Sequence, residues 1–258
     1  SGGFLGVDVF FVLSGFLITT LLLRDIVANG RIDLARFWAR RMARLMPAAL
    51  LLFVVVGIWS LTAAPAFRRP GLGTDVLWCL LYVGNWHFIA TSSYFAFDGT
   101  TSPLLHLWSL GVEEQFYFIW PLVLQGVAVL LAGASAGRHA RRDLLGVRNR
   151  STAAVMVTGG ALALISIVLM VQTYVTAGPD RAYMGTDTKV FEPLLGAVFA
   201  AATLRPRIGG LVRRYARELM VAGAGGLILA VVLLGSPAGP DPAYFFGGAV
   251  ATCLATVA

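Results

Sequence analysis

The sequence predicts an all-α protein, a polytopic transmembrane helical bundle with one re-entrant segment. Hydrophobic residues make up 58% of the 258 residues and charged residues only 13%, whereas a soluble domain carries about 25% charged residues. The mean hydropathy is +0.79. Apolar runs, most of them nearly long enough for a membrane-spanning helix, alternate with short basic stretches. These observations exclude an ordinary soluble domain and make the lipid bilayer the first expected partner.

A series of apolar runs defines the helices that we expect, in order along the chain. They cover residues 4–23, 47–64, 75–90, 104–132, 152–176, 189–204, 218–235 and 243 onward. Most of them approach the roughly 20 residues that a helix needs to cross a bilayer. Pro47 is expected in the first turn of its helix, where the missing N–H costs little.

Arginine-rich stretches separate several of these runs, at residues 24–44, 138–150 and 205–217. Because basic residues concentrate in cytoplasmic loops, we expect all three stretches on the cytoplasmic side. The net charge of +7 then reflects membrane topology rather than nucleic-acid binding, since the arginines do not follow one polar face. The other connections suit the outer side, with Arg68 and Arg69 as the exception.

Residues 75–90 form the run that we expect not to cross the membrane. If every run crossed, the basic stretch 138–150 would lie outside. This run is short and carries Asn85 and His87 near its end. Irregular backbone at membrane depth is tolerated where protein buries it or water lines it, so a re-entrant element predicts a neighbouring cavity. A conventional short helix with an unusual loop charge is the alternative.

Glu113 and Glu114 lie inside the apolar run 104–132. An acidic side chain near the bilayer centre costs roughly 3 kcal/mol, so it is usually retained where it pairs, faces a wet cavity or handles protons. On a helix, Glu113 shares a face with Ser109 and Tyr117. We therefore expect a groove lined by a carboxylate, a hydroxyl and a phenol, in which Glu113 acts as an acid, a base or an orienting group. A structural glutamate bonded to another helix would give the same pattern.

Asp8 lies near the outer end of the first apolar run. Its carboxylate could accept a hydrogen bond or orient a neighbouring base, while Ser14 and Gly15 allow another helix to approach closely. An interfacial aspartate with small-residue packing explains the same residues.

Arg41 and Arg44 lie one helical turn apart. Guanidinium groups bind phosphate bidentately and stay charged, so this pair suits a phosphate-rich donor such as coenzyme A. The alternative is a basic flank whose long side chains reach from the membrane to its surface.

A polar patch at residues 181–193 precedes and enters the run 189–204, and it contains Lys189, the only lysine of the chain. Asp187 is expected to cap the following helix. Glu192, one turn further in, needs another explanation because of its depth.

Histidines and cysteines are assigned no special chemistry. Without ligand spacing around them, the histidines are expected to make ordinary hydrogen bonds and the cysteines to pack in the interior, so no metal site or disulfide is predicted. These residues are His87, His106, His139, Cys79 and Cys253.

Taken together, these stretches resemble the acyltransferase-3 family of membrane O-acyltransferases, known as O-acetylases of bacterial lipopolysaccharide and peptidoglycan. The family's Gly-Val-Asp-x-Phe-Phe-x-Leu-Ser-Gly-Phe-Leu-Ile pattern is found at residues 6–18, and its Arg-x-x-Arg pair at Arg41 and Arg44. Its Trp-Ser-Leu-x-Val-Glu-Glu-Gln-Phe-Tyr pattern covers residues 108–117. Residues 185–189 are similar to its Gly-Thr-Asp-Thr-Arg motif, with Lys in place of Arg.

The resemblance implies a multi-pass enzyme of the inner (plasma) membrane, with no permanently bound cofactor. Acetyl-CoA, or another acyl-CoA, would donate the acyl group on the cytoplasmic side to a hydroxyl of an envelope glycan. Glu113 would be the catalytic acid–base or orienting group, with Asp8 and Trp108 in support, and Arg41 and Arg44 would hold the donor phosphates. The substrate-binding residues implied are Asp187, Thr188 and Lys189.

The ends of the chain suggest that residues 1–258 are a partial acyltransferase-3 membrane domain. Residue 1 is not Met, and the last apolar run is too short to span. Family members carry an Arg and, about eleven residues later, a His on a preceding helix, and neither is in this sequence, so we expect the fragment to be inactive alone. A proton-coupled secondary transporter, or a non-catalytic membrane partner in polysaccharide export, is the alternative function.

Overall fold

The computed structural model describes residues 2–63, 71–95, 101–133, 144–234 and 241–258, and the described residues form helices and no strands. The short η1 (Gly2–Phe4) leads into α1 (Leu5–Asn29), which α2 (Leu34–Thr62) follows. The next elements are α3 (Leu72–Leu80), α4 (Gly84–Thr91), η3 (Leu105–Leu107), α5 (Trp108–Gly133) and α6 (Leu144–Met184). The chain continues through α7 (Thr186–Lys189), α8 (Phe191–Thr203), α9 (Pro206–Arg214), α10 (Ala216–Leu234), η4 (Tyr244–Gly248) and α11 (Ala249–Val257). The predicted all-α class is confirmed.

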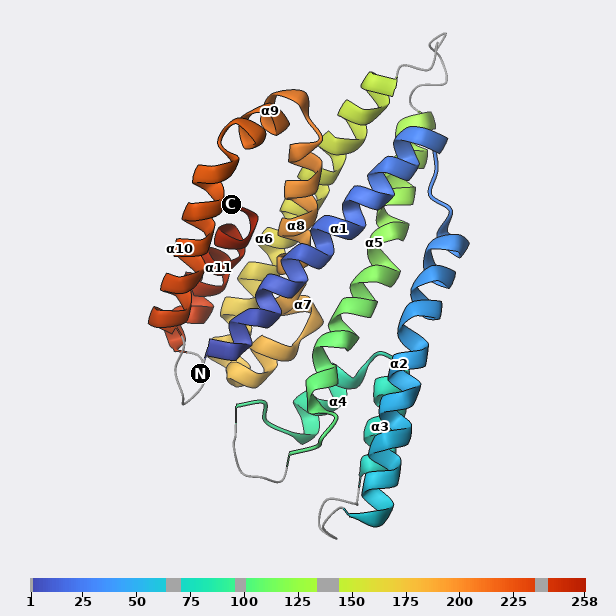
Figure 1. The fold of residues 1–258 in the computed structure, drawn as a ribbon, viewed down its shortest axis with the longest axis vertical. Helices are drawn as coiled ribbons and strands as arrows, with labels where there is room; N and C mark the ends of the chain where they lie inside the picture. The colour runs from blue at the N-terminus through green and yellow to red at the C-terminus, as the bar shows by residue number, and fades with distance from the viewer. Residues whose placement is uncertain (1, 64–70, 96–100, 134–143, 235–240) are drawn as a thin grey trace.

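Four described helices are long and apolar enough to cross a membrane, namely α1, α2, α10 and the part of α6 from Gly146 to Ala177. The number rises to five if the bent pair Thr186–Thr203 and Pro206–Arg214 counts as one span. The 26-residue α5 runs beside α1 and α2 (Figure 1). Large apolar side chains are exposed along α2 and α10, as expected for a surface in contact with hydrocarbon. The chain is therefore a multi-pass membrane protein.

Local sequence explains where several helices begin, end or break. Gly30 ends α1 with φ 73°, and its N–H donates to the Ile26 carbonyl. Asp33 caps the start of α2, because its side chain accepts the Arg36 N–H at 3.0 Å. Gly178, with φ 84°, breaks α6 immediately before Pro179. Each break occurs where the chain offers a residue that tolerates it.

Pro47 is not in the first turn of a helix, as the sequence predicted. The helix α2 begins at Leu34 and carries Pro47 in its interior. The apolar run starts at Pro47, but the arginine-rich residues before it are also helical and continue the same helix. Because proline has no N–H, the Ala43 carbonyl lacks the helical hydrogen bond that another residue at position 47 would donate.

The run 75–90, predicted to be re-entrant, forms a pair of short helices. Helix α3 has 9 residues and α4 has 8, so each is about 12–14 Å long and falls well short of a 30 Å hydrocarbon core. Tyr82, in the break between them, has a left-handed φ of 56°. Both helices lie at the end of the bundle opposite α9 (Figure 1).

The described parts of the arginine-rich stretches lie toward the same end of the bundle. The end of α1, the beginnings of α2 and α6, and α9 are spread across that end (Figure 1). The Ile32 N–H, between α1 and α2, donates to Gln125 Oε1 of α5 at 2.7 Å, and Arg205 Nε, at the start of α9, donates to Thr152 Oγ1 of α6 at 3.5 Å. The axis turns by 98° between Thr186–Thr203 and α9. A shared side of the membrane for the described parts of these stretches agrees with the predicted topology. Arg68, Arg69, His139 and residues 138–143 lie outside the described residues.

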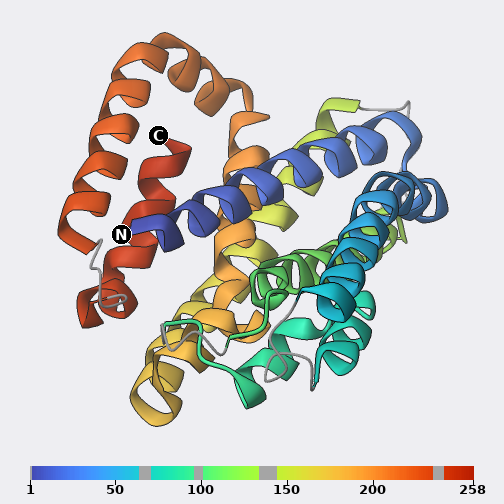
Figure 2. The ribbon, with the colours of Figure 1, turned by 60° about the horizontal axis from the view of Figure 1, so that its bottom comes forward.

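Helix α1 crosses the middle of the molecule, between the group of α2 to α5 and the pair α10 and α11 (Figure 2). Its closest neighbour is α8. A Cβ atom added at Gly15 would lie 1.9 Å from the Pro193 carbonyl oxygen, and one added at Gly196 would lie 2.0 Å from the Val12 oxygen. Glycine is therefore required on both helices for this approach, which brings polar groups of α1 and α8 together.

Candidate functional site

The adjacent carboxyl groups of Glu113 and Glu114 have different partners. Glu113 Oε1 accepts a hydrogen bond from Ser14 Oγ at 2.6 Å and another from the Tyr117 hydroxyl one turn further along α5. Glu114 Oε1 lies 3.4 Å from Arg41 Nη2. The two glutamate side chains are only 9% and 7% exposed. Glu113 thus faces α1, whereas Glu114 faces α2.

Arg41 joins α2 to this part of α5. Its Nη2 atom is also 3.9 Å from Glu113 Oε1, and its guanidinium carbon lies 3.3 Å from the centre of the Tyr117 ring. One turn earlier on α2, Trp38 Nε1 donates to the Tyr117 carbonyl at 3.1 Å. A positive charge is therefore held beside both glutamates and stacked on the phenol ring.

A cavity of about 460 Å³ opens beside these groups, between α2, α5 and the break that separates α3 from α4. Glu114 and Arg41 line it, and Glu113 is not among its lining residues. The lining residues are Trp38, Arg41, Met42, Leu81, Tyr82, Glu114, Gln115, Tyr117, Phe118 and Ile119. The neighbouring cavity that the re-entrant segment predicted is present, and Glu114 is the glutamate that a molecule inside it would meet.

Gln115 fixes the cavity wall. Its Nε2 atom donates to the Tyr82 carbonyl at 2.8 Å and to Asn85 Oδ1 at 2.9 Å, while its Oε1 accepts from Thr186 Oγ1 at 2.6 Å. Asn85 Nδ2 donates in turn to the Met184 carbonyl at 3.1 Å. One side chain of α5 therefore holds the α3–α4 break and α7 in place.

The phenol of Tyr82 lies at the rim of the cavity and donates to Met46 Sδ at 3.4 Å. Burial raises its pKa above the usual range; the Glu114 carboxylate adds to that rise and Arg41 opposes it. Tyr82 therefore remains protonated, and a hydrogen-bond donor, at neutral pH.

The predicted contacts of Glu113 with a phenol and a hydroxyl are present with one partner changed, but Glu113 is not among the residues that line the cavity. Tyr117 supplies the phenol, but the hydroxyl comes from Ser14 of α1, because the Ser109 hydroxyl donates to the His106 carbonyl at 3.2 Å. Sequence reasoning considered neighbours along the helix and could not place another helix against it. Sequence reasoning also did not predict that Glu114 lines the cavity. The only signal was that successive helical residues point about 100° apart, so that Glu113 and Glu114 must face different neighbours.

The predicted pair of arginines is not arranged as one fork. Arg41 is directed at the glutamates with its side chain 17% exposed, while Arg44 is exposed. Spacing along the helix is as expected, but the partners differ because α5 covers only the Arg41 side. The role of both residues toward a donor stays a prediction.

Asp8 and Trp108 lie outside the Glu113 contacts. Trp108 is buried against Phe11 and Tyr183, with ring centres 6.2 and 4.9 Å away. Asp8 belongs to a second polar cluster, in which it pairs with Lys189 at 2.7 Å. Their support of Glu113 would have to act through α1 and the aromatic packing.

The three predicted substrate-binding residues have internal partners. Asp187 does not cap α7, whose N-cap is Gly185 with no side-chain hydrogen bond. Its carboxylate instead accepts two bonds from Arg181, at 2.9 and 2.8 Å. Thr188 and Lys189 are completely buried, so their direct contact with a substrate stays a prediction without support in this conformation.

The remaining polar candidates have ordinary partners. His87 Nε2 lies 2.7 Å from Asp75 Oδ1, and its ring stacks on Trp78. Cys79 and Cys253 are buried free thiols. Within the described ranges, no group of three or more His, Cys, Asp or Glu side chains is arranged to hold a metal ion.

Comparisons with known proteins agree with the resemblance seen in the sequence. A family model described as an acyltransferase domain matches residues 1–258. The peptidoglycan O-acetyltransferase OatA of Listeria monocytogenes is 38% identical over 250 residues, which are 96% of this chain and 37% of that protein. The putative peptidoglycan O-acetyltransferase YrhL of Bacillus subtilis is 40% identical over 78% of this chain and 29% of its own length.

A further relative, the O-acetyltransferase OatA of Staphylococcus aureus, is 37% identical over 78% of this chain and 30% of its own length. The chain thus spans about a third of the length of these curated relatives. No solved structure matches it significantly. The match over the full chain, together with the motifs that line the Glu113 and Arg41 site, shows that the chain belongs to the acyltransferase-3 family.

Proposed function

We propose that this chain forms the membrane part of an enzyme that transfers an acyl group, acetyl in the first instance, from acyl-CoA to a hydroxyl of an envelope glycan. The observation that carries the proposal is the cavity of about 460 Å³ lined by Glu114, Arg41 and Tyr82 inside a membrane helix bundle. The relatives named for peptidoglycan O-acetylation support the reaction class and a glycan acceptor. A position in the inner (plasma) membrane would give the enzyme access to both the donor and the glycan.

The donor would enter the cavity with its thioester beside α5. Arg44 is exposed one turn along α2 from Arg41, so its guanidinium suits the phosphate groups of coenzyme A. Arg41 is already bound to Glu114, and it suits a role in orienting that carboxylate. Lining groups from α2 and α5 are largely aromatic or aliphatic, which suits the uncharged acyl end of the donor.

We assign the proton transfer to Glu114. The acceptor oxygen attacks the thioester carbon, the new C–O bond forms and the C–S bond breaks. The hydroxyl proton passes to the Glu114 carboxylate and from there to the departing thiolate, so the reaction consumes and releases no net proton. Glu113 keeps Tyr117 and Ser14 in position behind it, which is an orienting role.

The test is the transfer of labelled acetyl from acetyl-CoA to the envelope glycan, in membranes that contain the complete protein. We expect Glu114→Gln to lower the transfer rate by about 10²- to 10⁴-fold, the usual contribution of a general base. The neighbouring Glu113→Gln is the matched variant and should have a smaller effect. Protein amounts in the membrane must be equal for the comparison.

Full activity of Glu114→Gln beside an inactive Glu113→Gln would move the chemistry to Glu113. Equal activity of both variants and the wild type would remove the glutamates from the chemical step. If the wild type transfers no label, acetyl-CoA is not the donor. A longer acyl-CoA, and then proton-coupled uptake of solutes, would be assayed next.

A further inference from the structure

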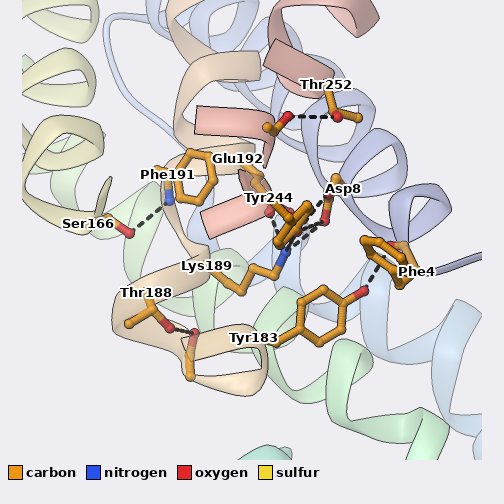
Figure 3. A network of polar contacts seen from close by, with 12 residues as sticks. Phe4, Asp8, Ser166, Tyr183, Thr188, Lys189, Phe191, Glu192, Tyr244 and Thr252 are labelled. Carbon is orange, nitrogen blue, oxygen red and sulfur yellow. Dashed lines mark hydrogen bonds and ion pairs between the residues drawn. The ribbon is translucent and has the colours of Figure 1, made fainter. Parts of the chain in front are cut away.

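A second polar cluster lies between α1, α7, α8 and η4, and consists of Asp8, Lys189, Glu192 and Tyr244 (Figure 3). The side chains of Asp8, Lys189 and Glu192 are 0% exposed, as is Tyr244 as a whole. The cluster does not contribute to the cavity beside Glu114. It is therefore an internal site that the proposed reaction does not use.

Lys189 is the centre of this cluster. Its Nζ atom donates to Asp8 Oδ1 at 2.7 Å, to Glu192 Oε1 at 2.6 Å and to the Tyr244 hydroxyl at 2.6 Å. The Tyr244 hydroxyl lies 2.9 and 2.8 Å from the two oxygens of Asp8. All three protons of the ammonium group thus have acceptors, and Tyr183 covers it with its ring centre 4.2 Å from Nζ.

The charges of the cluster do not balance if both carboxyl groups are ionised. Lys189 is the only positively charged group that the described residues bring within ion-pair distance of either Asp8 or Glu192. Other titratable groups that face the cluster are neutral when protonated, namely Tyr183 of α6, Tyr94 of the loop before α5, Tyr244 of η4 and Cys253 of α11. Two carboxylates and one ammonium would leave a net negative charge in the membrane interior, at a high energetic cost.

Glu192 shows where the balancing proton belongs. Its Oε2 atom is completely buried and has no hydrogen-bond partner, and a buried ionised oxygen without a donor is more costly than a neutral hydroxyl. The carboxyl groups of Asp8 and Glu192 bind the same Nζ atom of Lys189, at 2.7 and 2.6 Å. Repulsion between two ionised carboxylates held this close favours a proton on one of them.

We propose that Asp8, Lys189 and Glu192 form a buried proton-binding site, in which Glu192 is neutral and holds the proton while Asp8 and Lys189 form the ion pair. The site joins α1 to η4 through Tyr244. This segment is a short π-helix in which Gly247 has a φ of 149°. Loss of the proton would place two negative carboxylates side by side behind this irregular segment, so proton occupancy is linked to the docking of η4 and α11 on α1.

The test is infrared spectroscopy of the complete protein in lipid membranes at neutral pH. The wild type should show the C=O stretch of a protonated carboxyl group that is absent from Glu192→Gln. The matched control Glu218→Gln, at an exposed position of α10, should keep the band. Absence of any band that depends on Glu192 would mean that Glu192 is ionised and would overturn the proposal.

Isotope labelling locates the proton without any substitution. Labelled glutamate should shift the band and labelled aspartate should not; a shift with aspartate alone would place the proton on Asp8 and overturn the assignment. In Asp8→Asn, Glu192 becomes the sole counter-ion of Lys189, and we expect the band to disappear although Glu192 is still present. A band that persists in this variant would contradict the charge-balance argument, and the labelling result stands on its own if the variant fails to fold.

Discussion

The two polar clusters of this membrane domain differ in how they hold their charges. In the cluster beside the cavity, Arg41 lies 3.4 and 3.9 Å from Glu114 and Glu113. In the enclosed cluster, Lys189 lies 2.7 and 2.6 Å from Asp8 and Glu192, with no exposure of any of the three. In the first cluster the ion-pair distances are long and a cavity adjoins the charges. In the second the ion-pair distances are short and the charged side chains are fully enclosed. Intramembrane charge alone therefore does not identify a reaction site; an adjoining cavity is the feature that separates the two.

The largest expected effect is on folding, from Lys189→Met. Removing this cation leaves two carboxyl groups buried without their partner, and breaking a buried ion pair in this way costs about 3–5 kcal/mol. The free energy of unfolding in detergent, or the amount of folded protein in membranes, measures it. The double variant with Asp8→Asn should recover part of the loss, because one fewer carboxyl group needs a proton. Wild-type stability in Lys189→Met would end the distinction between the clusters.

The next largest effect is expected on donor binding near the cluster beside the cavity. Arg44→Ala should weaken acetyl-CoA binding by about tenfold or more, since a hydrogen bond to a charged group contributes about 1.5–3 kcal/mol, and it should leave unfolding unchanged. Calorimetric titration of the complete protein with acetyl-CoA measures this. Arg36→Ala is the control, because Arg36 is 70% exposed and pairs with Asp33 within α2. Equal affinities for wild type and Arg44→Ala would remove Arg44 from the donor site.

A third prediction concerns the helix that both clusters share. The methyl group of Gly15→Ala would meet the Pro193 carbonyl oxygen at 1.9 Å, so α1 and α8 must separate, at a cost of about 1–3 kcal/mol. Thermal unfolding should show the loss. Gly126→Ala on α5 is the control, since nothing lies within 4 Å of its added carbon. Equal stability of the two variants would show that the close approach of α1 and α8 is not required.

The smallest effect is expected at the partly exposed ion pair of Arg181 and Asp187. Their side chains are 24% and 36% exposed, so Asp187→Asn should change the unfolding free energy by less than about 1 kcal/mol. The same chemical change at Asp8 is the comparison, and its effect should be clearly larger. A large loss in Asp187→Asn, measured in the same unfolding assay, would place this outer pair among the structural determinants.

The course of the chain could be predicted from its sequence because span length and charge are local properties. The apolar run 4–23 corresponds to α1, the described parts of the arginine-rich stretches lie toward one end, and the short run 75–90 is a broken element. The error at Pro47 arose because helicity continued into residues that are not apolar. Hydropathy marks what lies in the membrane, while helix boundaries also depend on capping residues such as Asp33.

The candidate site could be predicted only in part because partners come from other helices. The sequence identified the paired glutamates and Arg41, but it could not tell that α2 covers Glu114 and α1 covers Glu113. It also gave Lys189 to a substrate, although Lys189 pairs with Asp8, 181 positions away in the chain. Such choices depend on the crossing of α1 and α8: Ser14 and Gly15 indicated a close helix approach, but not which helix would make it.

Ser14 and Asp8 place α1 in both clusters at once. The first bonds to Glu113 and the second to Lys189, and six residues of helix separate them by about 9 Å. A rigid helix cannot slide or turn at one end of that interval and remain still at the other. Helix α1 thus links the cavity cluster mechanically to the enclosed proton site. A shift along its axis that breaks the contact of Ser14 with Glu113 must also disturb the contact of Asp8 with Lys189.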